Sequence, residues 1–373
     1  MQEGGHHGGS APDGRSPVRG DVTATSRDVA PGIAAIAKRL AQAYGHTEVH
    51  AHWEAENSMR DGGDDPLEGV SAFTTEGHFH YVSYGLSELW DNDARGFRRA
   101  PGASGFGFEL TFRLACGEDK EAPSWPVGMM QRLARYVFRS GNVFRPGDHM
   151  DLNGPMGGGL TNSRLTGALF THDPTLGTID SRFGTVTFLQ IVGVTDDELE
   201  AVKDWRCEGF LEVLSRQDRL LMSDAKRDSY LLDGQFKAIC REGTRQEGSS
   251  HGSSFASVVG WEAHGEGEMN IRVGAIAVRD LLRMLTLRLP FNRPFRLHGK
   301  EASVHFVPGL GAGWQPSGND LVVSVPWDAA ATMANILKPV RGHYAWSGMP
   351  GLMLSVEPTE VRGSSGELVR VIG

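Results

Sequence analysis

The segment at residues 105–115 (GFGFELTFRLA) restricts the fold of this chain more than any other. Apolar and polar residues alternate along it, and side chains in a β-strand point by turns to opposite faces. One face carries five apolar side chains and the other three polar ones: Phe106, Phe108, Leu110, Phe112 and Leu114 against Glu109, Thr111 and Arg113. The pattern predicts a strand whose apolar face is buried in a core.

Helices and further strands are predicted both before and after this strand in the sequence. Residues 31–44 and 126–140 have apolar residues at helical spacing, and each segment ends at a glycine. A third helix is predicted after a capping box at residues 195–198 (TDDE). Strands are predicted at residues 78–85 and, buried on both faces, at residues 185–194. The mixture predicts an α+β fold.

The length of 373 residues predicts two domains, because single domains average about 150 residues. Residues 1–30 hold six glycines and no periodic apolar pattern, which predicts a disordered tail. Residues 31–262 are predicted to form the larger domain, residues 263–268 (AHGEGE) a short linker, and residues 269–373 a smaller α+β domain. The smaller domain is predicted to contain two helices and three strands, near residues 278–289, 328–338, 302–307, 320–326 and 351–358.

The chain is acidic, with 46 Asp and Glu residues against 37 Lys and Arg and a formal net charge of −9. An acidic surface repels phosphate backbones, so a basic protein or peptide is expected as the partner and nucleic acid is not. No run of about 18 apolar residues exists, so no membrane segment is expected. Cys116, Cys207 and Cys240 are widely spaced without a C-x-x-C pair, which favours a reducing cytoplasm over a disulfide framework.

Two familiar catalytic motifs are missing from the sequence, which has no G-x-x-x-x-G-K-[ST] and no H-E-x-x-H. We therefore expect no enzymatic activity and no cofactor. The pairs His50/His52 and His78/His80 have a spacing that places both rings on one face of a strand. Neither pair has the further ligands nearby that a zinc site needs, so no metal site is predicted.

Two other function classes remain open from the sequence. A metal-dependent hydrolase would use Asp148 and His149, together with the pair His78/His80, and would bind metal. A scaffold subunit would instead form a large homo-oligomer.

A binding site is predicted in the long glycine-rich loop at residues 141–163, because long loops in compact domains are often functional. The loop places Asp148 and His149 next to apolar Val143 and Phe144. A peptide cleft needs such a mixture, with apolar side chains for contact area and a carboxylate for orientation. A surface loop without a function is the alternative.

Five blocks in this order resemble the Suppressor of fused family: HYVSYGLSELW, SGFGFELTFRL, W-P followed by MQRLARYVF, GDH, and FGTVTFLQIVGVTDDEL. The resemblance covers about residues 65–262 and continues more weakly through LRLPFNRPF and GLMLSVEP. It implies a two-domain α+β clamp that closes on a short extended peptide of a partner without catalysis. The partner would be a regulatory protein or, for an immunity-like role in bacteria, a toxin, and the free protein would be a monomer.

The resemblance also implies which residues contact the partner. Tyr136 of ARYVF and Asp148 of GDH match peptide-contacting positions of the family, and Arg288 of TLRL matches a clamp arginine of the second domain. A buried carboxylate at Asp148 would pair with a partner His or Arg. The peptide would add as a strand between the two domains. The complete predicted partner site is Tyr136, Val143, Phe144, Asp148, His149 and Arg288.

Overall fold

The structure is a computed structural model and describes residues 30–46, 49–91, 93, 95–97, 100–117, 119–160, 162–265, 267–362 and 367–373. The tail predicted at residues 1–30 lies outside these ranges except for Ala30. Contacts divide the chain into two compact units. The first contains the chain up to Leu199 together with Leu211–Leu232, and the second contains Glu200–Phe210 and Asp233–Gly373.

An eight-stranded sheet is the centre of the first unit. Its strand order is β1-β2-β3-β4-β8-β6-β5, and β7 pairs with β8 off this path. The central pair, β4 and β8, is parallel, and the other pairs of the sheet are antiparallel. The strands are β1 (Ala51–Glu54), β2 (Gly69–Thr75), β3 (His78–Tyr84), β4 (Ala103–Ala115), β5 (His149–Asp151), β6 (Leu165–His172), β7 (Thr178–Ser181) and β8 (Gly184–Thr195).

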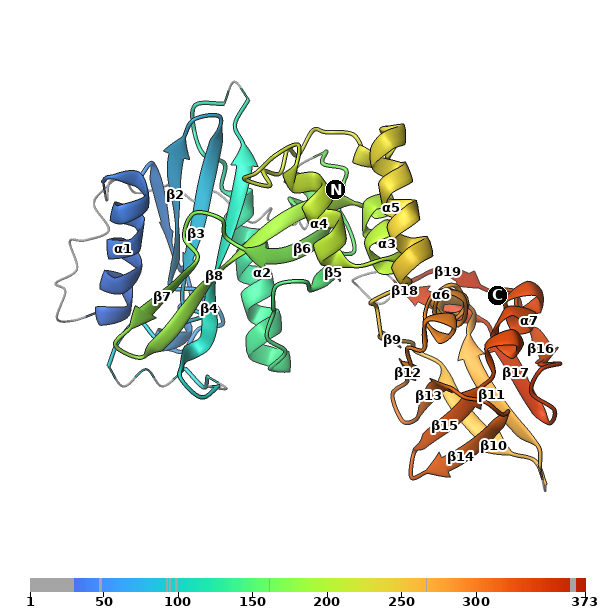
Figure 1. Cartoon of the computed structure of the whole chain (residues 1–373). Helices are drawn as coiled ribbons and strands as arrows, with labels where there is room; N and C mark the ends of the chain where they lie inside the picture. The colour runs from blue at the N-terminus through green and yellow to red at the C-terminus, as the bar shows by residue number, and fades with distance from the viewer. Residues whose placement is uncertain are drawn as a thin grey trace, which may run out of the picture. The chain divides into compact units, whose positions relative to one another are not determined.

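Helices of the first unit cover both faces of this sheet (Figure 1). The predicted ends are confirmed at Gly45 and Gly141, which adopt left-handed conformations with φ of 77° and 72°. One of the two bonds of the predicted capping box is present, because Thr195 N donates to Oε2 of Glu198 at 2.9 Å, whereas the Thr195 hydroxyl donates to Oδ1 of Asp197. The helices along this part of the chain are α1 (Pro31–Tyr44), α2 (Trp125–Ser140), α3 (Asp196–Asp204) and α4 (Cys207–Ser215).

Strand β4 has the alternation that the sequence predicts, and both of its faces are buried. The phenylalanine face packs in the same core cluster as the buried side of α2, whereas α1 packs in a cluster on the other face of the sheet. The polar face is also closed to solvent, with Glu109 and Thr111 at 0% exposure and Arg113 at 1%. Burying three polar side chains is costly unless each has hydrogen-bond partners, so this face requires a polar network.

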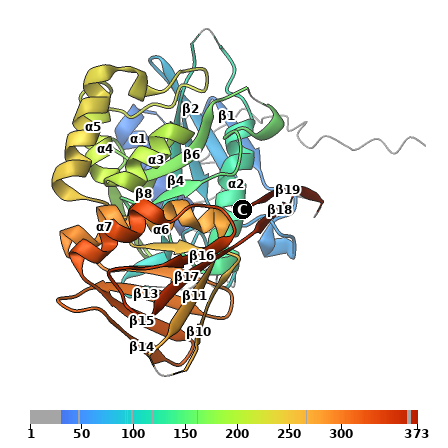
Figure 2. The same ribbon diagram turned by 90° about the vertical axis from the view of Figure 1, so that its right-hand side faces the viewer.

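The second unit contains two sheets, with the strand orders β10-β11-β17-β16 and β14-β15-β13-β12-β9. Helices α6 and α7 lie side by side (Figure 2) and share one core with both sheets. The helices are α5 (Gly234–Glu247), α6 (Val278–Leu287) and α7 (Trp327–Ile336). The strands are β9 (Ser253–Phe255), β10 (Val259–Ala263), β11 (Met269–Gly274), β12 (Phe295–His298), β13 (Ser303–Pro308), β14 (Gly313–Ser317), β15 (Asp320–Val325), β16 (Gly342–Ala345), β17 (Leu352–Glu357) and the separate pair β18 (Thr359–Arg362) and β19 (Leu368–Ile372).

The ends of the segment predicted as a linker, residues 263–268, belong to a hairpin between β10 and β11. Ala263 pairs with Met269 across this hairpin, and His264 N donates to Glu268 O at 2.9 Å. Hairpin pairing holds both ends of the segment inside the second unit. The two compact units therefore have other limits than the predicted domains. The predicted domain limits stay a prediction.

The helices of the described residues include none that is long and apolar enough to cross a membrane. All three cysteines are free thiols; Cys207 and Cys240 are buried, and Cys116 is half-buried.

We predict that Phe112→Ala lowers the free energy of unfolding of the first unit by about 3–5 kcal/mol, because it leaves a cavity in the core between β4 and α2. Urea unfolding followed by tryptophan fluorescence measures the change. Leu232→Ala is the control, since its side chain is 75% exposed. A loss below about 1 kcal/mol for Phe112→Ala would contradict the central position of β4.

Candidate functional site

The exposed side of α2 and the loop that follows it contain five of the six predicted site residues. Helix α2 buries one side against the sheet, including Met130, Leu133 and Val137, and this leaves Tyr136 on the outer side with 38% exposure. The helix ends at Gly141, whose left-handed conformation turns the chain back toward the sheet. The loop therefore runs close to the outer side of α2.

Three aromatic rings hold this loop in place. Phe144 stacks on Phe170 of β6, with centroids 4.1 Å apart and an angle of 13° between the ring planes. Tyr136 stacks on Phe144 at 5.6 Å and 26°. Nδ2 of Asn142 donates to the Tyr136 hydroxyl at 3.0 Å, and Val143 packs half-buried against the core. Phe144 and Phe170 are buried at 8% and 0% exposure, so a partner would meet the ring of Tyr136 alone, in an orientation that is set before binding.

Asp148 lies in a tight turn directly after this stack, and its carboxylate is exposed. Asp148 N donates to Arg145 O at 3.0 Å, and Oδ2 of Asp148 accepts from Arg145 N at 2.8 Å. The expectation of a buried carboxylate is wrong for the free chain, because the turn directs the side chain outward over its own backbone. The side chain is therefore in contact with solvent in the free chain.

His149 begins β5, the strand at the end of the sheet order. It is half-buried and pairs with Leu169 of β6. In the described part of the sheet β5 pairs with β6 alone, so its other edge offers main-chain donors and acceptors to an added strand.

Arg288 belongs to the second unit and is buried there at 8% exposure. Its Nη1 donates to Ser249 O at 2.7 Å, and its Nε donates to Pro294 O at 2.9 Å. Burial, with the nearby charge of Arg293, lowers its pKa. The side chain thus ties three segments of the second unit together, and its predicted role in partner binding stays a prediction.

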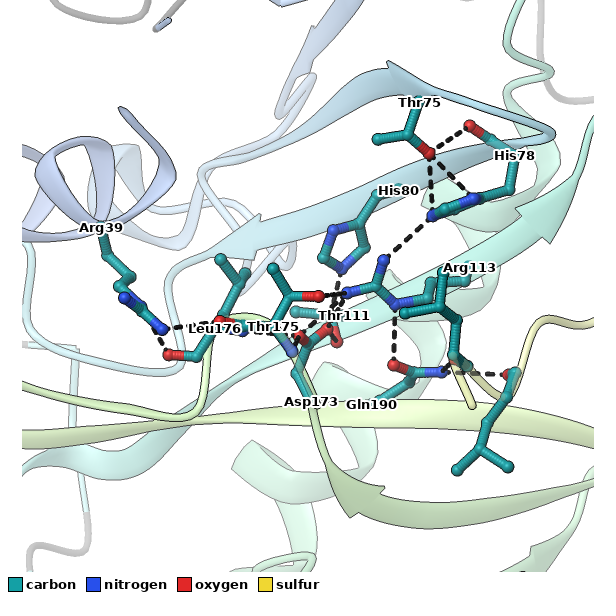
Figure 3. A network of polar contacts seen from close by, with 12 residues as sticks. Arg39, Thr75, His78, His80, Thr111, Arg113, Asp173, Thr175, Leu176 and Gln190 are labelled. Atoms are coloured by element: carbon teal, nitrogen blue, oxygen red, sulfur yellow. Dashed lines mark hydrogen bonds and ion pairs between the residues drawn. The ribbon is translucent and has the colours of Figure 1, made fainter. Parts of the chain in front are cut away.

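A second group of titratable residues lies buried under the polar face of β4 (Figure 3). Nη2 of Arg113 donates to Oδ1 of Asp173 at 3.0 Å, and the guanidinium also contacts Gln190 at 3.0 Å and Nε2 of His78 at 3.0 Å. Nε2 of His80 lies 2.9 Å from Oδ2 of Asp173. The five side chains come from three strands and the turn after β6, so the network holds these segments together.

The environment sets the protonation state of this network. Burial lowers the pKa of His80 to about 4, although the carboxylate of Asp173 raises it in part. Burial alone would raise the pKa of Asp173, but contact with His80 and the charge of Arg113 outweigh it, and the pKa is lowered. At neutral pH a charged Arg113–Asp173 pair therefore lies beside a neutral His80.

The contacts of the two histidine pairs oppose the metal hypothesis. The guanidinium of Arg113 lies beside His78, where a second cation would be repelled. Nδ1 of His52 contacts Ser71 Oγ at 2.9 Å, and Nε2 of His50 accepts from Ala122 N at 3.3 Å. Among the described residues no three or more His, Cys, Asp or Glu side chains are grouped as metal ligands, those at Asp148 and His149 included.

Sequence reasoning missed Arg113, Asp173 and Phe170 as organising residues. The polar face of β4 was visible in the alternation, but nothing in the sequence paired it with residue 173, which lies 60 positions away. Phe170 is one aromatic residue among many in strands. Both relations arise from strand pairing between distant segments.

The part of the chain that is similar to known proteins contains α2, its loop and β5. The model of the family described as Suppressor of fused protein matches residues 63–228. The Suppressor of fused homologs of Homo sapiens and Mus musculus are each 45% identical over 163 residues, which are 41% of this chain and 33% of each relative. The chain thus matches about a third of the length of these relatives.

A solved structure decides the membership. A chain in the crystal structure of the Sufu–Fu complex has 35% sequence identity to this protein. The match covers 57% of this chain and 98% of the chain in the complex, with a TM-score of 0.52. This protein belongs to the Suppressor of fused family. The crystal structure of Drosophila Suppressor of Fused covers 88% of this chain and 97% of its own, with a TM-score of 0.75 at 23% identity. The fold of the family therefore extends over most of the chain, and the predicted two-domain α+β architecture is confirmed.

We predict that Arg113→Met lowers the stability of the first unit by about 3–5 kcal/mol, because it leaves the Asp173 carboxylate buried without its cation. The double variant Arg113→Met/Asp173→Leu removes both charges and should recover most of this loss in urea unfolding. Equal destabilisation of the single and double variants would show that the pair does not act as a unit.

A separate prediction concerns pH. His80 has a pKa of about 4 in the fold against about 6.5 when unfolded, so the unfolded chain binds more protons between these values. Stability should fall as the pH falls through this window, and His80 should contribute about 2 kcal/mol of the loss between pH 7 and pH 5. Urea unfolding at both pH values measures this loss, and the His80→Gln variant should lose about 2 kcal/mol less than the wild type. The exposed His172→Gln is the control and should lose as much as the wild type.

Proposed function

We propose that this protein is a non-catalytic inhibitor or regulator that binds an extended segment of a partner protein. The binding surface consists of the exposed ring of Tyr136, which the buried Phe144 supports, the exposed carboxylate of Asp148, and the outer edge of β5. The single observation that carries this proposal is the stack of the exposed Tyr136 ring on the buried rings of Phe144 and Phe170. It lies beside an edge of β5 that pairs with no other strand in the described part of the sheet.

The chemistry of this surface suits an extended peptide. A strand edge binds main-chain groups of any sequence, while side-chain contacts supply selectivity. Tyrosine is enriched among the residues that contribute most to binding at interfaces, because it adds a large apolar area with few rotatable bonds. Asp148 would set the register by pairing with a basic side chain of the partner.

The family relationship supports a protein partner. A relative was crystallised as a Sufu–Fu complex, and the region of this chain that matches the family model includes Tyr136, Asp148 and β5. By extension we propose stoichiometric inhibition of a regulatory protein, or of a toxin in an immunity-like role, by a monomeric protein in the cytoplasm. Participation of Arg288 in the same binding event stays a prediction.

The full chain can be used to select binding peptides from a displayed library of random twelve-residue sequences. We predict that the affinity of the selected peptides depends on this surface. Tyr136→Ala should weaken their binding by about 2 kcal/mol, or roughly thirtyfold, because it removes the exposed ring. Asp148→Asn should weaken the peptides that contain a basic residue by about tenfold. Isothermal titration calorimetry measures both affinities.

Two matched variants serve as controls for this experiment. Trp327→Ala removes an aromatic side chain that is 74% exposed in the other unit, and Asp180→Asn removes an exposed carboxylate of β7. Both should bind the selected peptides like the wild type. Affinities unchanged by Tyr136→Ala and by Asp148→Asn would place the binding site elsewhere and refute the proposal.

A further inference from the structure

The outer side of α2 carries a concentration of positive charge that the net charge of the chain does not suggest. Arg132, Arg135 and Arg139 are spaced three and four residues apart, so they follow one side of the helix. Together with Tyr136, Ser140 and Asp64 they line a hollow of about 590 Å³. Three arginines thus surround a hollow that contains one acidic residue, in a chain with a net charge of −9.

Neighbouring residues hold two of these arginines in position. Arg135 forms an ion pair with the buried Asp65, and its Nε donates to Asp64 O at 3.3 Å. Nη2 of Arg132 donates to Met156 O at 3.2 Å. Their guanidinium groups therefore lose little conformational freedom when a ligand binds.

Arg139 differs from the other two. Its side chain is exposed and has no ion-pair or hydrogen-bond partner among the described residues. An exposed arginine beside two positioned ones leaves a positive charge that no neighbouring carboxylate in the described chain pairs with. An anionic group entering the hollow would meet donors from fixed and free guanidinium groups together, in the planar geometry that suits a carboxylate.

The position of Tyr136 links this hollow to the proposed peptide surface. Its ring stacks on Phe144, and the residue also lines the hollow. Asp148 lies outside the lining of the hollow and presents the opposite charge. The surface therefore offers positive charge along α2, an aromatic ring, and negative charge at the turn before β5.

We propose that the arginine hollow binds a Glu or Asp side chain of the partner segment, next to the residue that packs on Tyr136. This inference rests on the proposed function and specifies the partner's chemistry: an acidic residue on one side of the residue at Tyr136, in addition to a basic residue for Asp148. Charge complementarity selects this occupant. Nucleic acid is disfavoured because the net charge of −9 repels its other phosphates.

Fluorescence anisotropy with two synthetic probes tests the proposal on the full chain. One fluorescein-labelled peptide has the sequence Glu-Glu-Tyr-Glu-Glu, and the other, Gln-Gln-Tyr-Gln-Gln, has the same shape without charge. The acidic peptide should bind about tenfold tighter than the amide peptide in about 20 mM salt. Its affinity should fall several-fold in about 200 mM salt, because the charges are exposed.

Variants of Arg139 identify the site. Arg139→Gln should weaken the acidic peptide by up to about fivefold, the range for one exposed charge pair, and Arg139→Glu by about tenfold or more. Arg219→Glu makes the same charge change at an exposed position of the first unit outside the hollow, and it should stay within about twofold of the wild type. Far-ultraviolet circular dichroism and urea unfolding show whether each variant is folded, and Arg139→Gln provides the result if Arg139→Glu does not fold.

The following outcomes overturn the inference: equal affinity for the two peptides, equal effects of Arg139→Glu and Arg219→Glu, or a labelled single-stranded oligonucleotide that binds more tightly than the acidic peptide. Failure of the proposed function would appear elsewhere, as selected library peptides that bind Tyr136→Ala like the wild type. If the tests of the arginine hollow fail while Tyr136→Ala still weakens the selected peptides, the proposed peptide surface stands and only this inference is refuted.

Discussion

The buried ion pair between Arg113 and Asp173 is the interaction on which the first unit depends. Arg113 lies on β4, the strand that joins the antiparallel half of the sheet to β8, and Asp173 directly follows β6. The turn after Asp173 is also held from α1, because Arg39 donates to the carbonyl oxygens of Thr175 and Leu176 at 2.6 and 2.8 Å (Figure 3). The cost of desolvating such a pair is large, so it specifies one arrangement of these segments more than it adds to stability.

The same arrangement reaches the proposed binding surface through β6. Phe170 lies three residues before Asp173, and Asp173 N donates to Phe188 O of β8 at 2.9 Å. The end of β6 is therefore fixed by both main-chain and side-chain contacts. Phe144 stacks on Phe170, and Tyr136 stacks on Phe144, so the orientation of the exposed ring follows from a strand that the buried ion pair holds. A rigid scaffold under a loop is what gives a binding surface its preorganisation.

Charge on this surface is distributed unlike the charge of the whole chain. The net charge of −9 led to the expectation of a basic partner, and the exposed Asp148 agrees with it. The arginines of α2, which lie near Asp148 in the chain, favour an acidic group of the partner instead. An average over 373 residues does not determine the field at one hollow, because screening in salt limits the reach of exposed charges to about 10 Å.

Residue patterns were enough to predict several of the elements and the family. Periodicity and end signals predicted α1, α2 and β4, because an apolar face that packs on a core leaves a regular spacing of apolar residues in the sequence. The blocks around Tyr136 and Asp148 identified the family and the loop. Only the folded chain shows that the polar face of β4 is buried with Asp173, that Phe170 supports Tyr136, that Asp148 is exposed, and that Ala263 and Met269 pair across a hairpin. The burial with Asp173 and the support from Phe170 depend on pairing between segments distant in sequence, and local residue patterns carry no information about such pairing. The exposure of Asp148 and the hairpin arise from local contacts, between Arg145 and Asp148 and between Ala263 and Met269, which appear only in the folded chain.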